Sequence, residues 1–262
     1  MTSLRTETLT NGVTVTLTDR GAGPAVLVLH GGAGPVSVAR FVEAMSATHR
    51  VLAPTQPGFG GTPRPEWLMN IGDIAQTYSE LLERYELQDV LVIGFSMGGW
   101  VASELSTRAE GRMRGVILVD GAGGIRVEGH HVANVFALTP QQLSALSYHD
   151  PATFGIDPSR MAPEQIAAMA ANFKTLAIYL RDQESQDPTL RARLAKVKKP
   201  ALVIWGDSDR IISREYSQDY ANAFPRGRLE VIEKCGHLPQ VEQPERLMAL
   251  ISGFETEFPE HR

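Results

Sequence analysis

The sequence around Ser96 has the composition of a tight turn that presents a nucleophile. Residues 90–93 form a short apolar run typical of a buried strand, and the apolar spacing after the turn is typical of a helix. Ser96 therefore falls on the turn between them, where the central residue takes strained backbone angles. Gly94 and Gly98 flank it where side chains would collide as the helix folds back. We expect the hydroxyl to project and the N–H of Met97 to point toward an oxyanion formed there.

A serine hydroxyl needs help to react, because its proton must leave as the new bond forms. A histidine within hydrogen-bonding distance can take that proton and later return it to the leaving group. A carboxylate on the other ring nitrogen fixes the tautomer and stabilises the imidazolium. Chemistry at Ser96 therefore requires a histidine and an acidic residue delivered to the same place by other elements.

The elements that must position these groups follow the pattern of one large α/β domain. Asn11-Gly12 lies between two alternating segments and predicts a hairpin of two antiparallel edge strands. Beyond it, apolar strands alternate with amphipathic helices, as expected for a chain of 262 residues with a mostly parallel sheet. The expected strands span 25–29, 50–53, 90–93, 115–119, 200–205 and 229–232. Helices are expected after Asn70 and Thr139, from Pro163 and Pro244, and over the apolar positions Tyr216, Tyr220 and Phe224.

A glycine-rich segment follows the strand at 25–29. Its residues, His30-Gly31-Gly32-Ala33, leave backbone N–H groups free to face a ligand. We expect His30 to be a structural histidine that hydrogen-bonds this loop, in preference to a chemical role.

The turn at Ser96, with a buried strand before it and a helix after it, resembles the nucleophile elbow of the α/β-hydrolase fold superfamily. The resemblance is to serine hydrolases with a helical cap. It implies a mostly parallel central sheet with helices on both faces, formed by residues 1–122 and 199–262. Residues 123–198, where the alternation of strand and helix stops, would form the helical cap (lid) insertion. The alternative is two ordinary sheet-covering helices with long loops.

The order of residues in this fold assigns the reacting groups. Nucleophile, acid and histidine each follow a strand end in that order along the chain, a condition that Ser96, Asp209 and His237 satisfy. Asp120 also follows a strand and is the alternative acid. Asp207 is expected to order its turn instead.

The resemblance also implies an oxyanion hole made by the N–H groups of Met97 and Gly32, with Ala33 as the alternative to Gly32. Two further residues are set aside. His261 lies next to the C-terminus, where we expect fraying, and Cys235 is expected to be a packed thiol.

The implied activity is acyl transfer to water through an acyl-enzyme on Ser96, without a cofactor. An apolar cap favours a small organic carboxylic ester over a peptide or polymer. Trp100 fits either pocket lining or ordinary packing. The candidate pocket residues are Trp100, Phe136, Leu138, Tyr148, Phe154, Phe173 and Leu238.

Other reactions of the superfamily remain alternatives. The segments around His30 and His237 are similar to those of hydrolases that cleave a C–C bond in ring-cleavage (vinylogous diketone) products, although their tryptophan after the histidine is Leu238 here. Proline-releasing peptidases share the H-G-G loop, but the inserted segment lacks a clear acidic pair for a substrate amine. Dehalogenases and epoxide hydrolases need a carboxylate at the position of Ser96. A ligand receptor without catalysis is the alternative from another class.

Composition limits the partners. The net charge of −5 gives no indication of nucleic acid or an anionic membrane. With one cysteine, a polar N-terminus and no apolar run of about 18 residues, we expect a cytoplasmic protein that acts on a small molecule. His130, His131 and His149 lack the spacing of a metal site, so no metal is expected. The oligomeric state stays open, with a homo-oligomer allowed.

Overall fold

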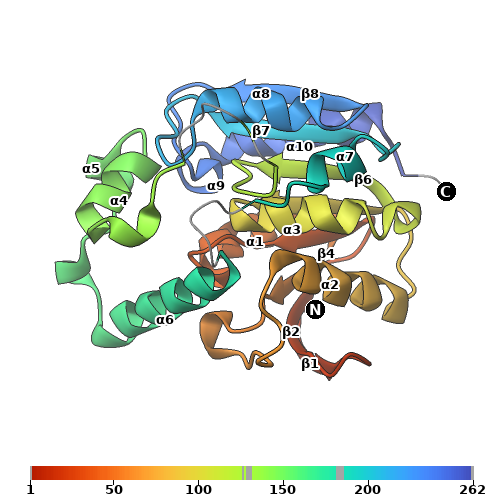
Figure 1. The fold of residues 1–262 in the computed structure, drawn as a ribbon, viewed down its shortest axis with the longest axis horizontal. Coiled ribbons are helices and arrows are strands. Elements are labelled where there is room, and N and C mark those ends of the chain that lie inside the picture. Colours follow the sequence, from red (N-terminus) through yellow and green to blue (C-terminus); the bar gives the residue numbers. More distant parts are fainter. Residues whose placement is uncertain (1, 126, 128–131, 181–185, 261–262) are drawn as a thin grey trace.

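The computed structural model describes residues 2–125, 127, 132–180 and 186–260. Within these residues, eight strands form one sheet in the order β1-β2-β4-β3-β5-β6-β7-β8 (Figure 1). The pairs β1–β2 and β2–β4 are antiparallel, and the remaining pairs are parallel. The strands are β1 (Thr2–Thr8), β2 (Thr14–Arg20), β3 (Ala25–Leu29), β4 (Arg50–Thr55), β5 (Val90–Phe95), β6 (Met113–Val119), β7 (Ala201–Gly206) and β8 (Gly227–Ile232).

Helices cover both faces of this sheet, because its central strands are apolar on both sides. On one face α2 (Ile71–Arg84), α3 (Met97–Ser106) and α8 (Arg214–Asn222) bury their apolar sides, and on the other face α1 (Ala39–Met45) and α10 (Pro244–Glu257) do so. The predicted α/β fold with a mostly parallel sheet is confirmed.

The N-terminal hairpin differs from the prediction in one respect. Asn11-Gly12 does connect two antiparallel strands, but only β1 is an edge strand. The second, β2, also pairs with β4 through residues 16–20. Its alternating burial places Val15 and Leu17 in the core on one face of the sheet, while its two backbone edges pair with β1 and β4.

The segment 123–198 holds α4 (Pro140–Ser147), α5 (Pro151–Phe154), α6 (Pro163–Tyr179) and α7 (Leu190–Leu194). Figure 1 shows α4, α5 and α6 standing to one side of the sheet, with α7 beside α3. Leu190 and Leu194 of α7 are fully buried in the core that α3 shares. The last part of this segment therefore packs on the sheet-bearing core. In the described part of the chain, none of the helices has the length and hydropathy needed to cross a membrane.

The elbow depends on glycine where α3 folds back over the sheet. A Cβ on Gly98 would lie 2.2 Å from the carbonyl oxygen of Leu29, and one on Gly94 would lie 2.2 Å from the carbonyl oxygen of Gly98. Backbone atoms cannot swing aside as a flexible side chain can. Any side chain at these positions must therefore push α3 away from β3 and β5.

We expect Gly98→Ala to lower the free energy of unfolding by about 3 kcal/mol, because overpacking against backbone forces the helix to shift. Gly253→Ala in α10 is the matched control, since a Cβ there meets no atom within 4 Å. This control should raise stability by about 0.5–1 kcal/mol through helix propensity. Urea denaturation measures both, and equal effects of the two substitutions would contradict the close approach at Gly98.

Candidate active site

Three side chains from distant parts of the sequence meet at the carboxyl edge of the sheet. Ser96 follows β5, Asp209 follows β7 and His237 follows β8. The Nε2 atom of His237 lies 2.8 Å from the Oγ of Ser96, and its Nδ1 atom lies 2.7 Å from the Oδ2 of Asp209. An ionised carboxylate can only accept, so Nδ1 carries the proton and Nε2 accepts from the hydroxyl. The imidazole is thus in the tautomer that can take a proton from Ser96.

Ser96 is held in a strained backbone conformation by its neighbours. Its φ is 50° and its ψ is −122°, in the positive-φ region that residues other than glycine rarely adopt. The N–H of Ser96 donates to Val119 O in β6, while its carbonyl accepts from the N–H groups of Gly99 and Ala122 at 2.7 and 3.0 Å. The start of α3 and the loop after β6 together fix where the hydroxyl points.

Asp209 is oriented by its own turn. Its Oδ1 atom accepts from the N–H groups of Ile211 and Ile212 at 2.8 and 3.2 Å, which leaves Oδ2 for His237. Asp207 accepts from the Cys235 N–H and the Ser208 hydroxyl. The two aspartates therefore have different partners, since Asp209 contacts His237 and Asp207 contacts its own turn and the start of the histidine loop.

Asp120 lies close to Asp209 and His237, but it is not hydrogen-bonded to His237. It is fully buried, and its Oδ1 accepts from the Gly206 N–H at 2.9 Å. Burial, followed by the negative charge of Asp209, raises the pKa of Asp120 well above its usual value. Asp120 therefore favours its protonated form more strongly than an exposed aspartate does, and Asp209 is the carboxyl group that contacts His237.

The same cluster has the donor types of a metal site. Single donor atoms of Asp120, Asp209 and His237 lie within 4.8 Å of one another. Both ring nitrogens of His237 are already engaged, however, by Ser96 and Asp209. A proton relay accounts for this geometry without an ion.

His30 holds the glycine-rich loop, in its predicted structural place. Its buried ring donates from Nδ1 to Gly31 O at 2.8 Å and accepts at Nε2 from the Gln56 N–H at 3.0 Å. Burial lowers the pKa of His30 to about 4. Gly31 lies directly against Ser96, because a Cβ on it would be 2.9 Å from the Ser96 Cβ. Within the described residues, the N–H groups of Gly32 and Ala33 donate to no acceptor, so either could face a ligand.

The α6 helix is held onto this loop by polar contacts that sequence reasoning missed. Asn172 donates to Ala33 O at 3.1 Å and accepts from the Gly60 N–H at 2.9 Å. One turn further on, Thr175 donates to Gly58 O at 2.8 Å. Their spacing on an otherwise apolar helix was the available signal, but it does not say which loop they meet.

A buried glutamate joins the histidine loop to the corner between α4 and α5. Glu242, in the short helix α9 (Pro239–Glu242), accepts from the N–H groups of Gly236 at 2.6 Å, His149 at 3.0 Å and Asp150 at 3.1 Å. The N–H of His237 itself donates to Ser147 O at 2.7 Å. This contact was not predicted from the sequence.

The loop that carries Asp209 also contacts the segment between α4 and α5. The N–H of Arg210 donates to Leu146 O at 3.1 Å, and its guanidinium donates to Tyr148 O at 2.9 Å. Residues 146–150 therefore contact both the loop that carries Asp209 and the loop that carries His237.

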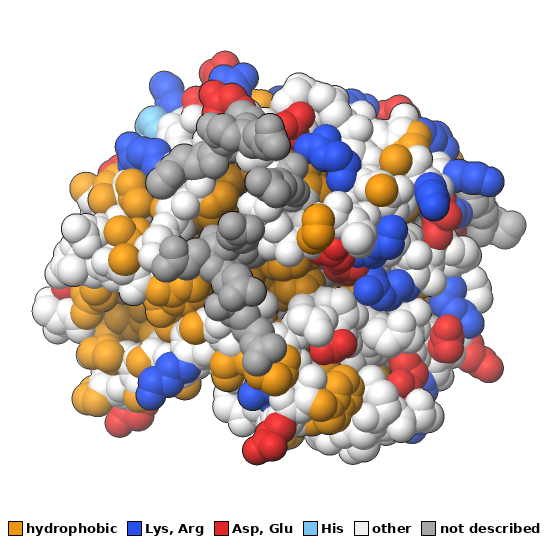
Figure 2. All heavy atoms as spheres, in the orientation of Figure 1, with side chains coloured by type: hydrophobic (Ala, Val, Ile, Leu, Met, Phe, Trp, Pro, Cys, Tyr) orange, Lys and Arg blue, Asp and Glu red, His pale blue; other side chains and the backbone are white. Residues whose placement is uncertain are grey.

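The predicted pocket residues divide into separate groups. Trp100 is 8% exposed and packs against Gly124. A Cβ on Gly124 would lie 2.7 Å from the Cδ1 atom of Trp100. Phe136 meets Phe173 edge-on at 5.3 Å between ring centroids, and Tyr148 stacks on Phe154 at 6.5 Å. Leu138 and Leu238 are half-buried. Figure 2 shows hydrophobic side chains gathered in a hollow between α4 and α6.

The remaining candidates are placed as follows. Cys235 is fully buried, and burial raises the pKa of its thiol, so it is a packed thiol in an unreactive form. The ring of His149 is hydrogen-bonded to the Ser208 hydroxyl at 2.8 Å. His130, His131 and His261 lie outside the described residues.

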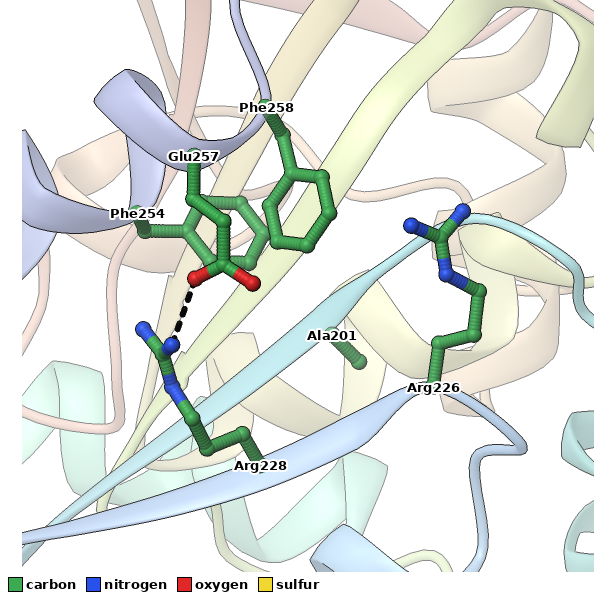
Figure 3. A pocket seen from close by; sticks show the side chains of 6 residues that line it. All are labelled: Ala201, Arg226, Arg228, Phe254, Glu257 and Phe258. Atoms are coloured by element: carbon green, nitrogen blue, oxygen red, sulfur yellow. Dashed lines mark hydrogen bonds and ion pairs between the residues drawn. The ribbon is translucent and has the colours of Figure 1, made fainter.

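A pocket lies at the edge of the sheet opposite the one that carries Ser96, Asp209 and His237 (Figure 3). It is lined by residues at the starts of β7 and β8 and at the end of α10, whereas Asp209 and His237 follow the other ends of those strands. Its charged groups already have partners: Arg228 pairs with Glu257 at 2.6 Å, and Arg226 stacks on Phe258 at 5.1 Å. This pocket is separate from the cluster around Ser96.

Comparison with known proteins agrees with this fold. The model of the alpha/beta hydrolase family matches residues 26–250. The chain is 28% identical over 244 residues to the dihydrolipoyllysine-residue acetyltransferase component of an acetoin cleaving system of Pseudomonas putida, covering 89% of this chain and only 64% of that relative. It is 27% identical over 271 residues to a 2-hydroxymuconate semialdehyde hydrolase of Pseudomonas putida, covering 96% and 94% of the two chains. A thermophilic esterase from Thermogutta terrifontis has the same fold, with a TM-score of 0.76, 23% identity and coverage of 98% and 99%. This chain belongs to the alpha/beta hydrolase family.

The pKa of His30 makes stability depend on pH. The folded-state pKa of about 4 lies below the ordinary 6.5, so the stabilisation is complete above pH 6.5 and is lost as the pH falls toward 4. We expect the free energy of unfolding to fall by about 3 kcal/mol over this window from His30 alone. Urea titrations at several pH values should show a flatter profile for His30→Gln. Parallel profiles for the two proteins would contradict this assignment.

Proposed function

We propose that this protein is a serine hydrolase that cleaves small organic carboxylic esters through an acyl-enzyme on Ser96. The observation that carries the proposal is the continuous hydrogen-bonded chain from the Ser96 hydroxyl through His237 to Asp209. That arrangement activates a serine for attack on a carbonyl carbon. Residues 123–198 are proposed to act as the cap over the substrate, with its last helix, α7, packed on the core.

The reaction follows from the positions of these groups. The Oγ of Ser96 attacks the ester carbonyl as its proton passes to Nε2 of His237, and the N–H groups of Met97 and Gly32 or Ala33 receive the oxyanion. Collapse of the tetrahedral intermediate expels the alcohol, which takes the proton from His237. Water then attacks the acyl-enzyme with His237 again as base, and releases the acid and the free hydroxyl.

Hydrolysis of a C–C bond is the second candidate, because a relative covering nearly the whole chain is named a 2-hydroxymuconate semialdehyde hydrolase. The same nucleophile and base would serve. One position favours the ester, because Leu238 replaces the tryptophan that follows the histidine in that group. Parallel assays with aryl esters and dienone substrates discriminate the two reactions.

Ser96→Ala should abolish ester hydrolysis and leave the free energy of unfolding unchanged or slightly higher, because only a reactive polar group is removed. Hydrolysis of p-nitrophenyl butanoate and intact-mass detection of an acyl adduct measure the effect. Turnover by the wild type that does not exceed that of the variant would favour a ligand receptor over an enzyme.

Asp209→Asn should lower kcat by about 10³–10⁴-fold, because the amide no longer fixes the tautomer of His237. Asp120→Asn is the matched control, since the amide oxygen can still accept from the Gly206 N–H and Asp120 is not hydrogen-bonded to His237, so kcat should change by less than about threefold. Steady-state kinetics at pH 7.5 measure both. The larger loss in the Asp120 variant would mean that the acid has been misassigned.

A further inference from the structure

One face of α6 carries a continuous row of large apolar side chains. Leu176, Phe173, Met169 and Ile166 are separated by three, four and three residues, a spacing that places them along one side of a helix. Their exposure rises along the row. Leu176 is buried, Phe173 and Met169 are half-buried, and Ile166 is 43% exposed. We name these four residues the α6 row.

The α6 row begins at the candidate active site. The side chain of Leu176 covers Gly32, since its Cδ2 lies 2.6 Å from where a Cβ on Gly32 would be. Gly31, the preceding residue, lies against Ser96. The polar residues that hold α6 to the glycine loop, Asn172 and Thr175, lie beside the row on the adjoining face. The hydrogen bonds that hold α6 to the glycine loop therefore do not involve the side chains of the α6 row.

A second apolar surface faces the outer part of the row. Phe136 meets Phe173 edge-on and is itself 43% exposed. Figure 2 shows this region as a hollow lined by hydrophobic side chains between α4 and α6. Large apolar side chains exposed together on a protein surface mark a binding site more often than chance, because burying them in contact with a ligand is favourable.

We propose that the α6 row and Phe136 bind the apolar acyl tail of the ester whose carbonyl lies at Ser96. This inference rests on the proposed function for the ester group and adds the substrate class. Residues 166 and 176 are ten positions apart, so the row is about 15 Å long, roughly the length of an extended chain of ten to twelve carbons. The charged residues of α6, Glu164 and Lys174, are out of register with the row, which disfavours a charged tail.

Kinetics with p-nitrophenyl esters of increasing acyl length test the proposal. Each CH2 that leaves water is worth roughly a factor of three, and decanoate has six more of them than butanoate. Burial of only two or three of these groups should therefore raise kcat/KM about tenfold or more from butanoate to decanoate. Ile166→Gln and Met169→Gln place a polar group on the row and should each lower the decanoate-to-butanoate ratio at least about threefold. Ala167→Gln, on an exposed face away from the row, is the matched control and should keep the wild-type ratio. A wild-type rate that does not increase with length, or ratios that the row variants do not change, would overturn the proposal.

Binding without turnover separates this inference from the proposed reaction. Calorimetry with the Ser96→Ala variant should show p-nitrophenyl decanoate binding at least about tenfold more tightly than p-nitrophenyl butanoate. Met169→Gln in that background should remove this difference in affinity between the two esters. If the wild type hydrolyses no ester but this binding pattern is found, the tail site stands and ester hydrolysis is wrong. If esters are hydrolysed but decanoate and butanoate bind alike, the tail site is wrong and the reaction stands.

Discussion

The position of the His237 ring is the constraint on which the rest of the site depends. One ring nitrogen must meet a hydroxyl on the turn after β5, and the other must meet a carboxylate on the turn after β7. Both requirements are satisfied only because β5, β6, β7 and β8 are parallel and end at one edge. The close approach of α3 at Gly98 serves the same constraint, since it brings Ser96 to that edge.

The carboxyl groups near this ring are kept from repelling one another by different means. Asp209 faces the imidazole and two backbone N–H groups, while Glu242 is surrounded by N–H groups from three residues. Asp120 has one N–H partner and is deeply buried, which favours its protonated form. Each of the three carboxyl groups therefore has its own environment, and Asp209 is the one hydrogen-bonded to the His237 ring.

The sequence was informative where function depends on strand ends. Ser96, Asp209 and His237 could be found because each follows an apolar run, and parallel strands deliver such positions to one edge. The family and its sheet followed from the same pattern, although the place of β2 inside the sheet depends on pairing with β4 that local patterning does not encode. The contacts of Glu242, Asn172 and Leu176 could not be found. Glu242 binds the N–H groups of His149 and Asp150, and Asn172 binds backbone groups of the glycine-rich loop, all more than 85 positions away. Leu176 covers a glycine whose neighbours only the folded chain defines. The packing of α7 on α3 was missed for the same reason.

The inserted segment contacts the two halves of the site at separate points. Residues 146–150 are hydrogen-bonded to the loops that carry Asp209 and His237, and α6 is hydrogen-bonded to the glycine-rich loop after β3. The segment thus links these loops, and the distance between the Asp209–His237 pair and the glycine-rich loop is set partly by its own fold. Swinging it away as a rigid door would break contacts to both sides at once. Displacement of α4, α5 and α6 would accordingly remove hydrogen bonds from the loops that hold Asp209, His237 and the glycines after β3, so the order of these loops is coupled to the position of the inserted segment.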